Sequence, residues 1–362
     1  MRILYVTTIS LTMNSFFKPH IDMLVKEGHQ VDIACNDKES PLDSLYEQLG
    51  CQFHTIDFSR SPLSFDNIKA YGQLKKVVEN GNYDIVHCHT PNASVITRLV
   101  CRQFRKKIGL KVFYTAHGFH FYKGAPVLNW LFFYPVEKFC SCFTDKLITI
   151  NKEDYKLAKN KFKAKEVHYV PGVGIDLSRF QSVEVDRVAK RREIGVPKDA
   201  FLLLSVGELN KNKNHQIVIK ALKNLNNPKV HYAIAGIGEL QFDLLKLARE
   251  LDVENQFHLL GYRRDVLSLY KISDIYIHPS FREGLPVAVM EALAAGTTVL
   301  TSNIRGCEDL VSDNLFVPND LDSLMKILHN YRTNGKLDKI FTQKNVIERI
   351  IELYEDTTFV EH

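Results

Sequence analysis

Short apolar runs alternate with longer amphipathic stretches along this chain, and this alternation constrains the fold more than any other feature. In the first half, runs typical of strands occur at 3–7, 31–35, 85–88 and 112–116. Stretches with helical length and periodicity lie between them, at 16–27, 68–79 and 93–107. Because strands and helices alternate, we predict a parallel sheet with helices on both of its faces.

The alternation stops at a glycine- and proline-rich segment, residues 169–175, and then restarts. Strand-like runs follow at 201–206, 232–235, 257–260, 275–278 and 298–301, with helical stretches at 216–224 and 287–295. We therefore predict an α/β protein with two Rossmann-like, doubly wound domains, at 1–170 and 171–341. Such sheets bind ligands outside the carboxyl ends of their strands, so we expect a substrate cleft between the two domains.

Length and composition narrow the class of protein. A chain of 362 residues can bury two cores, and no stretch approaches the roughly 20 apolar residues of a membrane-spanning helix. The N-terminus has too short an apolar run for a signal peptide, so we interpret it as a first strand. The seven cysteines show no metal-ligand spacing, which favours reduced thiols in a cytoplasmic protein.

The segment from His278 to Glu291 holds the residues with the clearest chemical meaning. A strand ends at His278, a loop carries Glu283 and Gly284, and Pro286 suits the first turn of the next helix. A helix start presents free N–H groups and is a natural site for phosphate. The two glutamates are eight residues apart, so one can meet a sugar and the other a ribose. Taken singly, a helix cap and a solvated glutamate would also account for them.

This segment resembles the E-x7-E motif of the retaining, family-4 glycosyltransferases of the GT-B fold. Further segments look like signatures of that family, in the family's order, at 84–89, 115–118, 170–176 and 236–238. Residues 115–122 and 151–155 resemble its capsule and exopolysaccharide branch. The resemblance implies transfer of a sugar from a nucleoside diphosphate sugar, in particular a UDP-sugar, to a hydroxyl of a lipid-linked saccharide, with retention of anomeric configuration.

The resemblance also implies roles for individual residues. His117 would lie near the donor sugar and the acceptor, Glu283 would act at the sugar, and Lys213 would stabilise the charge that develops on the leaving diphosphate. Glu208 stands where the family commonly has arginine, which increases the demand on Lys213. The residues expected to bind the donor are Glu291, Gly284, Leu285, Gly207, Gly236 and Arg263.

Two further expectations concern the first strand and the end of the chain. Asn14 and Ser15 are expected in the loop after the first strand, where relatives often have glycines that approach phosphate or acceptor. The segment 342–362 begins with an amphipathic helix, and the resemblance implies that it packs back on the N-terminal domain.

No metal and no cofactor besides the donor substrate are expected. No acidic pair of the DxD type is placed to hold a metal, so cationic side chains and backbone N–H groups should replace the ion. A nucleic-acid partner is disfavoured, because no aromatic-interleaved binding motif accompanies the basic residues.

The basic residues instead suggest a membrane surface. Residues 1–180 hold 24 lysines and arginines against 17 acidic residues. Arg98, Arg102 and Arg105 recur at near-helical spacing, Lys106 and Lys107 extend them, and an apolar stripe of Ile96, Leu99, Val100 and Phe104 lies alongside. The apolar stretch 127–134 holds the only tryptophan. A basic amphipathic helix suits an anionic surface, so we expect attachment to the inner face of the cell membrane through Arg102, Arg105, Lys106 and Lys107. A solvated basic face over an ordinary core is the alternative.

Two other functions fit the same sequence. A nucleotide-sugar epimerase of the same fold would need no lipid acceptor. A non-catalytic partner subunit of a glycosyltransferase is consistent with Glu208, although His117, Lys213, Glu283 and Glu291 are all present.

Overall fold

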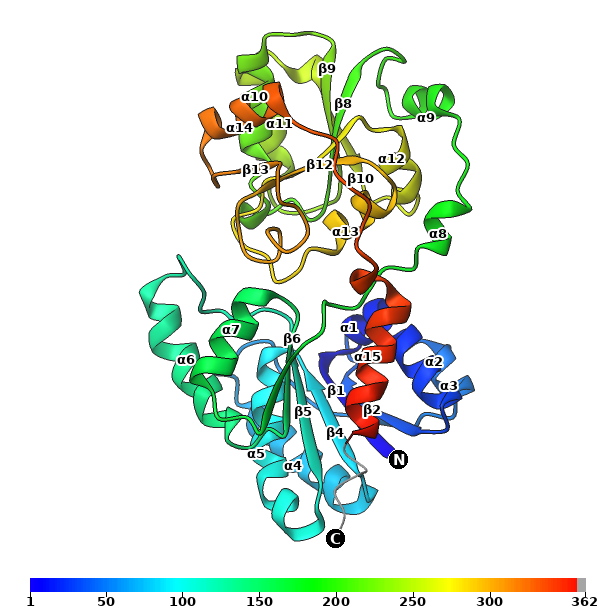
Figure 1. Ribbon diagram of the computed structural model, residues 1–362, viewed down its shortest axis with the longest axis vertical. Helices are drawn as coiled ribbons and strands as arrows, with labels where there is room; N and C mark the ends of the chain where they lie inside the picture. The colour runs from blue at the N-terminus through cyan, green and yellow to red at the C-terminus, as the bar shows by residue number, and fades with distance from the viewer. Residues whose placement is uncertain (357–362) are drawn as a thin grey trace. The chain divides into compact units, whose positions relative to one another are not determined.

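The computed structural model describes residues 1–356, which divide into two compact units. The N-terminal unit comprises Met1–Val173 and the C-terminal segment that begins at Asn345, and the C-terminal unit comprises Gly174–Lys344 (Figure 1). Of the segment 342–362 that the sequence analysis singled out, residues 357–362 lie outside the described residues. Each unit is built on one parallel sheet, which confirms the predicted fold class of two Rossmann-like domains.

The N-terminal unit contains a seven-stranded sheet in the order β3-β2-β1-β4-β5-β6-β7. Its strands are β1 (Arg2–Ile9), β2 (Gln30–Asn36), β3 (Phe53–Thr55), β4 (Ile85–His89), β5 (Lys111–Ala116), β6 (Lys146–Thr149) and β7 (Glu166–Tyr169). Its helices are α1 (Ser10–Phe16), α2 (Lys18–Lys26), α3 (Ser44–Gln48), α4 (Asp66–Gly81), α5 (Pro91–Ile108), α6 (Val127–Ser141), α7 (Lys152–Lys161) and α15 (Gln343–Glu355).

Alternate residues of β1 supply the cores on the two faces of this sheet. Leu4 and Val6 pack under α4, α5, α6 and α7, whereas Ile3 and Tyr5 pack under α1, α2, α3 and α15. This follows from the period of two along a strand. The strand order reverses between β1 and β4, which pair in register from Ile3↔Ile85. Ligands of doubly wound sheets bind beyond the carboxyl ends of the strands at such a reversal.

The helix predicted at 16–27 is present as α2, but the helix α1 that precedes it was not predicted. Helix α1 begins directly after β1, at Ser10, and ends at Phe16, and α2 follows from Lys18 with a proline in its first turn. Residues at α-helix starts tolerate proline because their N–H groups lack an intrahelical partner. A consequence is that the expected loop position of Asn14 and Ser15 was wrong, since both lie within α1.

The C-terminal unit contains a six-stranded sheet in the order β10-β9-β8-β11-β12-β13. Its strands are β8 (Phe201–Val206), β9 (Val230–Ala235), β10 (Phe257–Gly261), β11 (Ile275–His278), β12 (Thr298–Ser302) and β13 (Leu315–Phe316). Its α-helices are α8 (Ser178–Gln181), α9 (Arg187–Glu193), α10 (Gln216–Leu225), α11 (Gln241–Glu250), α12 (Val266–Ile272), α13 (Val287–Ala294) and α14 (Leu321–Asn330). Short 3-10 turns are η1 (Lys211–Lys213), η2 (Glu254–Gln256) and η3 (Lys339–Phe341). Helices α10, α11 and α14 cover one face of this sheet.

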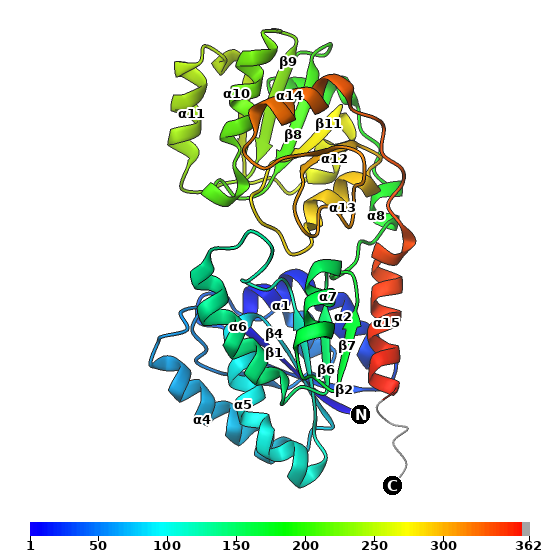
Figure 2. The same ribbon diagram turned by 60° about the vertical axis from the view of Figure 1, so that its left-hand side comes forward.

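Helix α15 belongs to the core of the N-terminal unit although it comes last in the chain. Val346, Ile350, Leu353 and Tyr354 are buried in the same cluster as the first strand, β1. The Tyr354 ring stacks on Phe113, and Lys146 Nζ donates to the Leu353 carbonyl at 2.8 Å. Figure 2 shows α15 alongside the N-terminal unit.

Candidate functional site

A partly buried ion pair marks the carboxyl ends of β8 and β11 in the C-terminal unit. Lys213 Nζ lies 2.7 Å from Glu283 Oε1, and the two side chains are 21% and 15% exposed. Lys213 is the last residue of η1, which follows β8, and Glu283 lies in the loop that follows β11. Parallel strands end at the same edge of their sheet, which explains how residues 70 positions apart meet.

His278, the last residue of β11, fixes the orientation of Glu283. Its Nε2 lies 2.9 Å from Glu283 Oε1, and its Nδ1 lies 3.0 Å from the Tyr276 hydroxyl. A carboxylate can only accept, so Nε2 carries the hydrogen and the Tyr276 hydroxyl donates to Nδ1. Burial lowers the pKa of His278, while Glu283 acts in the opposite direction. No role for His278 or Tyr276 was predicted, although a histidine at the end of a strand, directly before the loop of Glu283, was a sign of a site residue.

Glu283 is held in its ionised form. Burial alone would raise its pKa, but the hydrogen bond from His278 and the nearby charge of Lys213 outweigh burial and hold the pKa well below its usual range. Arg305 Nε also donates to the backbone carbonyl of Glu283 at 3.0 Å, which fixes the loop itself. An anionic, positioned carboxylate can accept hydrogen bonds from sugar hydroxyls.

Glu291 has a different environment. It lies on α13, and the Tyr270 hydroxyl donates to its Oε2 at 3.0 Å. Burial raises the pKa of Glu291, and the hydrogen bond from Tyr270 partly opposes this. The two glutamates of the motif therefore differ in chemistry, and the predicted division of roles between sugar and ribose remains a prediction.

Glycines bring the loops of the C-terminal unit into direct backbone contact. A Cβ on Gly236 would lie 1.8 Å from the Gly207 carbonyl oxygen, so no side chain fits there. A Cβ on Gly306 would likewise lie 2.2 Å from the carbonyl oxygen of Gly284. The aliphatic part of the Lys213 side chain passes close to Gly207, and a Cβ on Gly207 would lie 3.3 Å from Lys213 Cε. These glycines shape the loops around the Lys213–Glu283 pair, and their contact with a donor is a prediction.

The remaining predicted donor residues occupy distinct positions. Leu285 is buried immediately before Pro286, the residue that precedes α13, where no side chain caps the helix. Arg263 forms ion pairs with Asp265 at 2.6 Å and with Glu193 at 2.5 Å. Glu208 is exposed and accepts a hydrogen bond from Asn210 at 2.9 Å.

A cluster of histidines lies at the carboxyl ends of β4 and β5 in the N-terminal unit. His89 Nδ1 lies 3.2 Å from His117 Nε2, and His87 Nε2 lies 2.8 Å from the Thr115 hydroxyl. His20, from α2, adds to the group and packs on Phe17. Burial lowers the pKa of His117 and of His20 to about 4, so both are neutral at physiological pH. A neutral His117 can donate one hydrogen bond and accept another.

The structure places Asn14 and Ser15 in the first helix, and the amide of Asn14 is occupied there. Asn14 Nδ2 donates to the Pro41 carbonyl at 3.0 Å, and Asn14 Oδ1 accepts from the Asp43 backbone at 3.0 Å. The side chain thus ties α1 to the segment before α3. These residues were predicted in a loop because a loop was expected after β1, but α1 begins directly where β1 ends.

Part of the proposed basic membrane face was also misassigned. Arg98 is buried and pairs with Glu137 at 2.8 Å, and the stripe Ile96, Val100 and Phe104 faces the core. Arg105 forms a bidentate pair with Asp145, at 2.8 and 2.6 Å. Arg102, Lys106 and Lys107 are exposed near the end of α5. The basic residues of α5 therefore lie on different sides of the helix: Arg98 faces the core, whereas Arg102, Lys106 and Lys107 face solvent.

Exposed apolar side chains gather instead on α6, which packs beside α5 (Figure 1). Val127, Leu128, Leu131, Phe132, Val136 and Phe139 are between 44% and 82% exposed. The opposite side of α6, with Trp130, Phe133 and Tyr134, packs against the core. The apolar stretch found in the sequence is thus half core and half surface.

Within residues 1–356, no group of three or more histidine, cysteine or acidic side chains is arranged to hold a metal ion. No helix in that described part is both long and apolar enough to cross a bilayer. All seven cysteines are free thiols.

Comparisons with known proteins place this geometry in context. Residues 186–346 match the family described as glycosyl transferases group 1, and residues 2–151 match the family described as glycosyl transferase 4-like. A Bacillus subtilis protein named as a glycosyltransferase, EpsD, is 36% identical over 86% of this chain and 81% of its own length. An Escherichia coli protein named UDP-Gal:alpha-D-GlcNAc-diphosphoundecaprenol alpha-1,3-galactosyltransferase is 27% identical over 91% of this chain and 89% of its own. The structure of Anabaena Alr3699/HepE with UDP-glucose has the same fold, with a TM-score of 0.76, 17% identity and coverage of 98% of this chain and 100% of that one.

Proposed function

Since this chain belongs to the group 1 glycosyltransferases, we propose that it transfers a sugar from a UDP-linked donor to a hydroxyl of a lipid-linked saccharide, with retention of configuration. The observation that carries the proposal is the Lys213–Glu283–His278 cluster at the carboxyl ends of β8 and β11. The similar E. coli protein is named for a UDP-sugar donor and a diphosphoundecaprenol-linked acceptor, which supports the choice of both substrates. Resemblance to the capsule and exopolysaccharide branch supports a product of that class.

The proposal assigns a role to each group of the C-terminal unit. Lys213 stabilises the negative charge that develops on the leaving diphosphate, aided by the N–H groups at the start of α13. Glu283 accepts hydrogen bonds from the donor sugar, and Glu291 binds the ribose. In the ligand-free protein Lys213 pairs with Glu283. When the donor binds, the Lys213 ammonium group would contact the diphosphate as well as Glu283.

His117 has the corresponding role in the N-terminal unit. It is neutral and half-buried, and its Nε2 is hydrogen-bonded to His89, so its Nδ1 is the ring nitrogen that can hydrogen-bond to a sugar hydroxyl. Epimerisation on the same fold is the second candidate, and it differs in needing no acceptor.

The test of this function is a screen of nucleotide sugars for binding, followed by transfer assays on saccharides linked to a lipid diphosphate. We expect UDP release only when an acceptor is added, and an α-linked product from an α-linked donor, read by NMR. We also expect turnover to persist in EDTA, because cationic side chains and helix N–H groups are proposed to replace a metal. Release of an epimerised sugar without acceptor, or activity lost in EDTA and restored by magnesium or manganese, would contradict the proposal.

Glu291→Ala should chiefly weaken donor binding. A ribose contact is present in the ground state and the transition state alike, so its loss raises KM more than it lowers kcat. Titration with UDP measures this directly, and Tyr270→Phe, which removes only the hydroxyl that donates to Glu291, should show a smaller effect in the same direction. A pure kcat defect with unchanged donor affinity would exclude Glu291 from donor binding.

We further propose that the N-terminal unit attaches to the inner face of the cell membrane through α6. Its six exposed apolar side chains form a face of the kind that enters the boundary between headgroups and acyl chains. Arg105 Nη1 donates to the Cys142 carbonyl, so the ends of α5 and α6 are adjacent, and the exposed Lys106 and Lys107 follow Arg105 on α5. Each cation near an anionic surface contributes about 1 kcal/mol.

Sedimentation with anionic liposomes should therefore capture the protein at low salt, and added salt should weaken binding. Leu131→Ser with Phe132→Ser should abolish capture, and Arg102→Glu, Lys106→Glu and Lys107→Glu together should reduce it. Arg105 is left unchanged, because its charge is paired with Asp145. Ile68→Ser, an exposed apolar residue on α4, is the matched control and should have no effect. If neither set of substitutions reduced the amount of protein that sediments with the liposomes, this mode of attachment would be refuted.

A further inference from the structure

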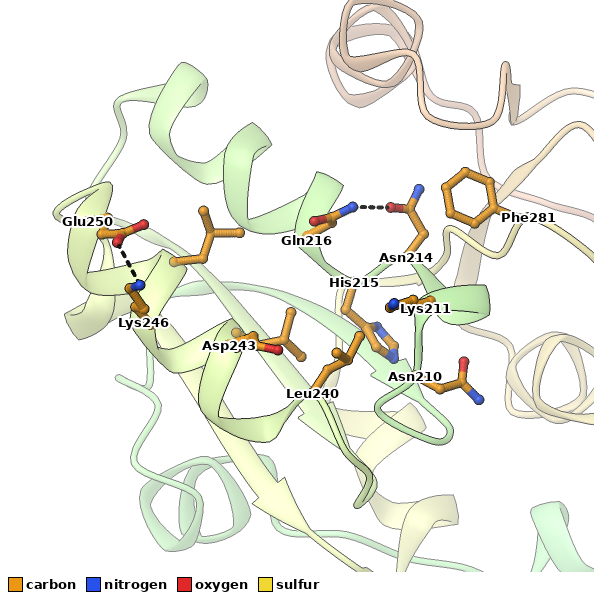
Figure 3. Close-up of a pocket in the computed structure, with 12 residues that line it drawn as sticks. Asn210, Lys211, Asn214, His215, Gln216, Leu240, Asp243, Lys246, Glu250 and Phe281 are labelled. Carbon is orange, nitrogen blue, oxygen red and sulfur yellow. Dashed lines mark hydrogen bonds and ion pairs between the residues drawn. The ribbon is translucent and has the colours of Figure 1, made fainter.

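Several buried side-chain nitrogens of the described residues have no hydrogen-bond partner. Two of them, Asn214 Nδ2 and His215 Nε2, belong to residues that line a cavity of about 560 Å³ beside α10 and α11 (Figure 3). Both atoms are closed off from solvent, so neither can meet a ligand in that cavity. A third, His89 Nε2, belongs to a ring whose other nitrogen bonds to His117. His89 therefore contacts a residue to which the proposed function assigns a role.

His89 is enclosed by other aromatic rings at the end of a strand. It is the last residue of β4, is 2% exposed, and stacks on Tyr5 with 5.0 Å between ring centroids. The centroids of Phe17 and His87 lie 4.4 and 4.2 Å from that of His89. Rings packed this closely restrict the rotation of a side chain. The packing therefore keeps His89 Nδ1 directed at His117.

The backbone next to His89 is held in a conformation that most residues avoid. Thr90 has φ 64° and ψ 140°, a region that is costly for a β-branched residue. The other non-glycine residues with positive φ in the described part of the chain are asparagines or aspartate. Thr8 N donates to Thr90 Oγ1 at 3.0 Å, and the two hydroxyl oxygens lie 2.8 Å apart. Strain of this kind costs about 1–3 kcal/mol and clusters at functional sites, which draws attention to the end of β4.

The loop that carries His117 is anchored independently of His89. Phe119 N donates to Asp154 Oδ2 at 3.0 Å, and Asp154 is a fully buried residue of α7. Within residues 1–356, His89 is the one hydrogen-bond partner of the His117 ring. Loss of the hydrogen bond from His89 should therefore change the ring of His117 and leave its loop in place.

The two rings are neutral, so each carries one hydrogen. Burial lowers the pKa of His89 well below its usual value, and it lowers the pKa of His117 to about 4. Of the two nitrogens that meet, one must donate and the other must accept. If His117 donated, the hydrogen of His89 would lie on Nε2 as a buried N–H without an acceptor, which is rare and costs about 1–3 kcal/mol. Hydrogen on His89 Nδ1 leaves no donor unpaired, and it places the hydrogen of His117 on Nδ1.

We propose that His89 is a positioning residue that fixes which nitrogen of His117 carries hydrogen. His89 Nδ1–H donates to His117 Nε2 and keeps that nitrogen an acceptor, so His117 offers the substrate an N–H donor at Nδ1. The group that it contacts is then an oxygen with a free lone pair, as on a sugar hydroxyl. The inference rests on the proposed function for the identity of that substrate, but the place of the hydrogen on His117 does not.

Nitrogen NMR of the full chain, isotope-labelled at its histidines, shows which ring nitrogen carries hydrogen. His117→Phe identifies the signals of His117 by their loss. In the unchanged protein at neutral pH we expect hydrogen on His117 Nδ1, and His89→Leu should release this preference because no donor then holds Nε2. Hydrogen on His117 Nε2 in the unchanged protein overturns the proposal, and so does a preference that survives in His89→Leu.

Transfer assays measure what this arrangement contributes. His89→Leu should lower kcat/KM about tenfold, the effect of one lost hydrogen bond. Asparagine has the shape of leucine but carries an amide N–H that can donate to His117 Nε2, so His89→Asn should recover most of the loss. His258→Leu removes one ring of a histidine pair in the C-terminal unit, joined to His231 at 2.9 Å, and should have no effect. Equal activity of the leucine and asparagine variants would show that His89 only fills space, which overturns the proposal.

The two kinds of measurement separate this inference from the proposed function. The NMR result needs neither substrate nor turnover. If the unchanged protein transfers no sugar, the proposed function fails, and hydrogen on His117 Nδ1 still stands. If the protein transfers sugar while His117 carries its hydrogen on Nε2, the proposed function stands and the role of His89 is overturned. UDP titration of the His89 variants should match that of the unchanged protein, because His89 belongs to the N-terminal unit.

Discussion

Replacing Lys213 with alanine should lower kcat by about 10²-fold or more, the typical loss for one preorganised group that stabilises transition-state charge. That loss corresponds to about 2.7 kcal/mol of transition-state stabilisation. The structure shows a second effect of this substitution, on Glu283. Lys213 is the cation that contacts Glu283, and its removal leaves a partly buried carboxylate with the neutral His278 as a partner. The alanine variant therefore loses the charge for the leaving group and disturbs the carboxylate as well.

Two further variants separate these effects. Lys213→Arg keeps the positive charge and should recover part of kcat, whereas Lys220→Ala removes an exposed lysine of α10 and should leave kcat unchanged. Single-turnover transfer with saturating donor measures the chemical step, and UDP titration measures donor binding. Turnover of Lys213→Ala equal to that of the unchanged protein would remove Lys213 from the mechanism.

Replacing Glu137 with alanine should lower the free energy of unfolding of the N-terminal unit by about 3–5 kcal/mol, because it leaves Arg98 as an uncompensated buried charge. Arg98 is 1% exposed and lies 2.8 Å from Glu137. Its guanidinium also stacks over Tyr114, with 4.2 Å to the ring centroid, and Nε donates to the Ser94 carbonyl at 3.1 Å. These contacts hold the guanidinium in place but do not neutralise it.

Denaturant unfolding followed by circular dichroism measures this loss. Replacing both partners together, Arg98→Met with Glu137→Met, should restore most of the stability, because an apolar pair of similar volume leaves no buried charge. Asp22→Ala, which breaks the exposed pair with Lys26, is the control and should change stability by less than about 1 kcal/mol. A Glu137→Ala variant as stable as this control would contradict the prediction, because it would show that the buried charge of Arg98 does not depend on Glu137 for its compensation.

The sequence predicted the sheets well because their strands are buried on both faces. The ranges 201–206 and 275–278 coincide with β8 and β11, whose side chains are almost all buried and apolar. A continuous apolar run of that length between helical stretches leaves little choice but a parallel strand. The same pattern missed α1, because this helix begins directly after β1 and nothing in the periodicity marks the boundary between them.

The limits of prediction at the site have a physical cause. Lys213 and Glu283 could be named from a resemblance, but their direct contact depends on two loops brought together by strand order. Tyr276 and His278 were missed because a polar side chain inside a strand gives no sign of its partner. Arg98 was misread for the opposite reason, since a basic residue in an amphipathic helix usually faces water and here faces Glu137.

The position of α15 has a consequence for how this protein folds during its synthesis. During synthesis the ribosome delivers the seven strands of the N-terminal unit first, but the side chains of Val346, Ile350 and Tyr354 that complete their core emerge only after the whole C-terminal unit. The C-terminal unit is one uninterrupted stretch of chain, so it can close its core before the N-terminal unit does. Until then, the part of the first sheet that α15 covers, including Phe113 under Tyr354, stays open. The nascent chain thus carries an N-terminal unit with an incomplete core while the whole C-terminal unit is synthesised.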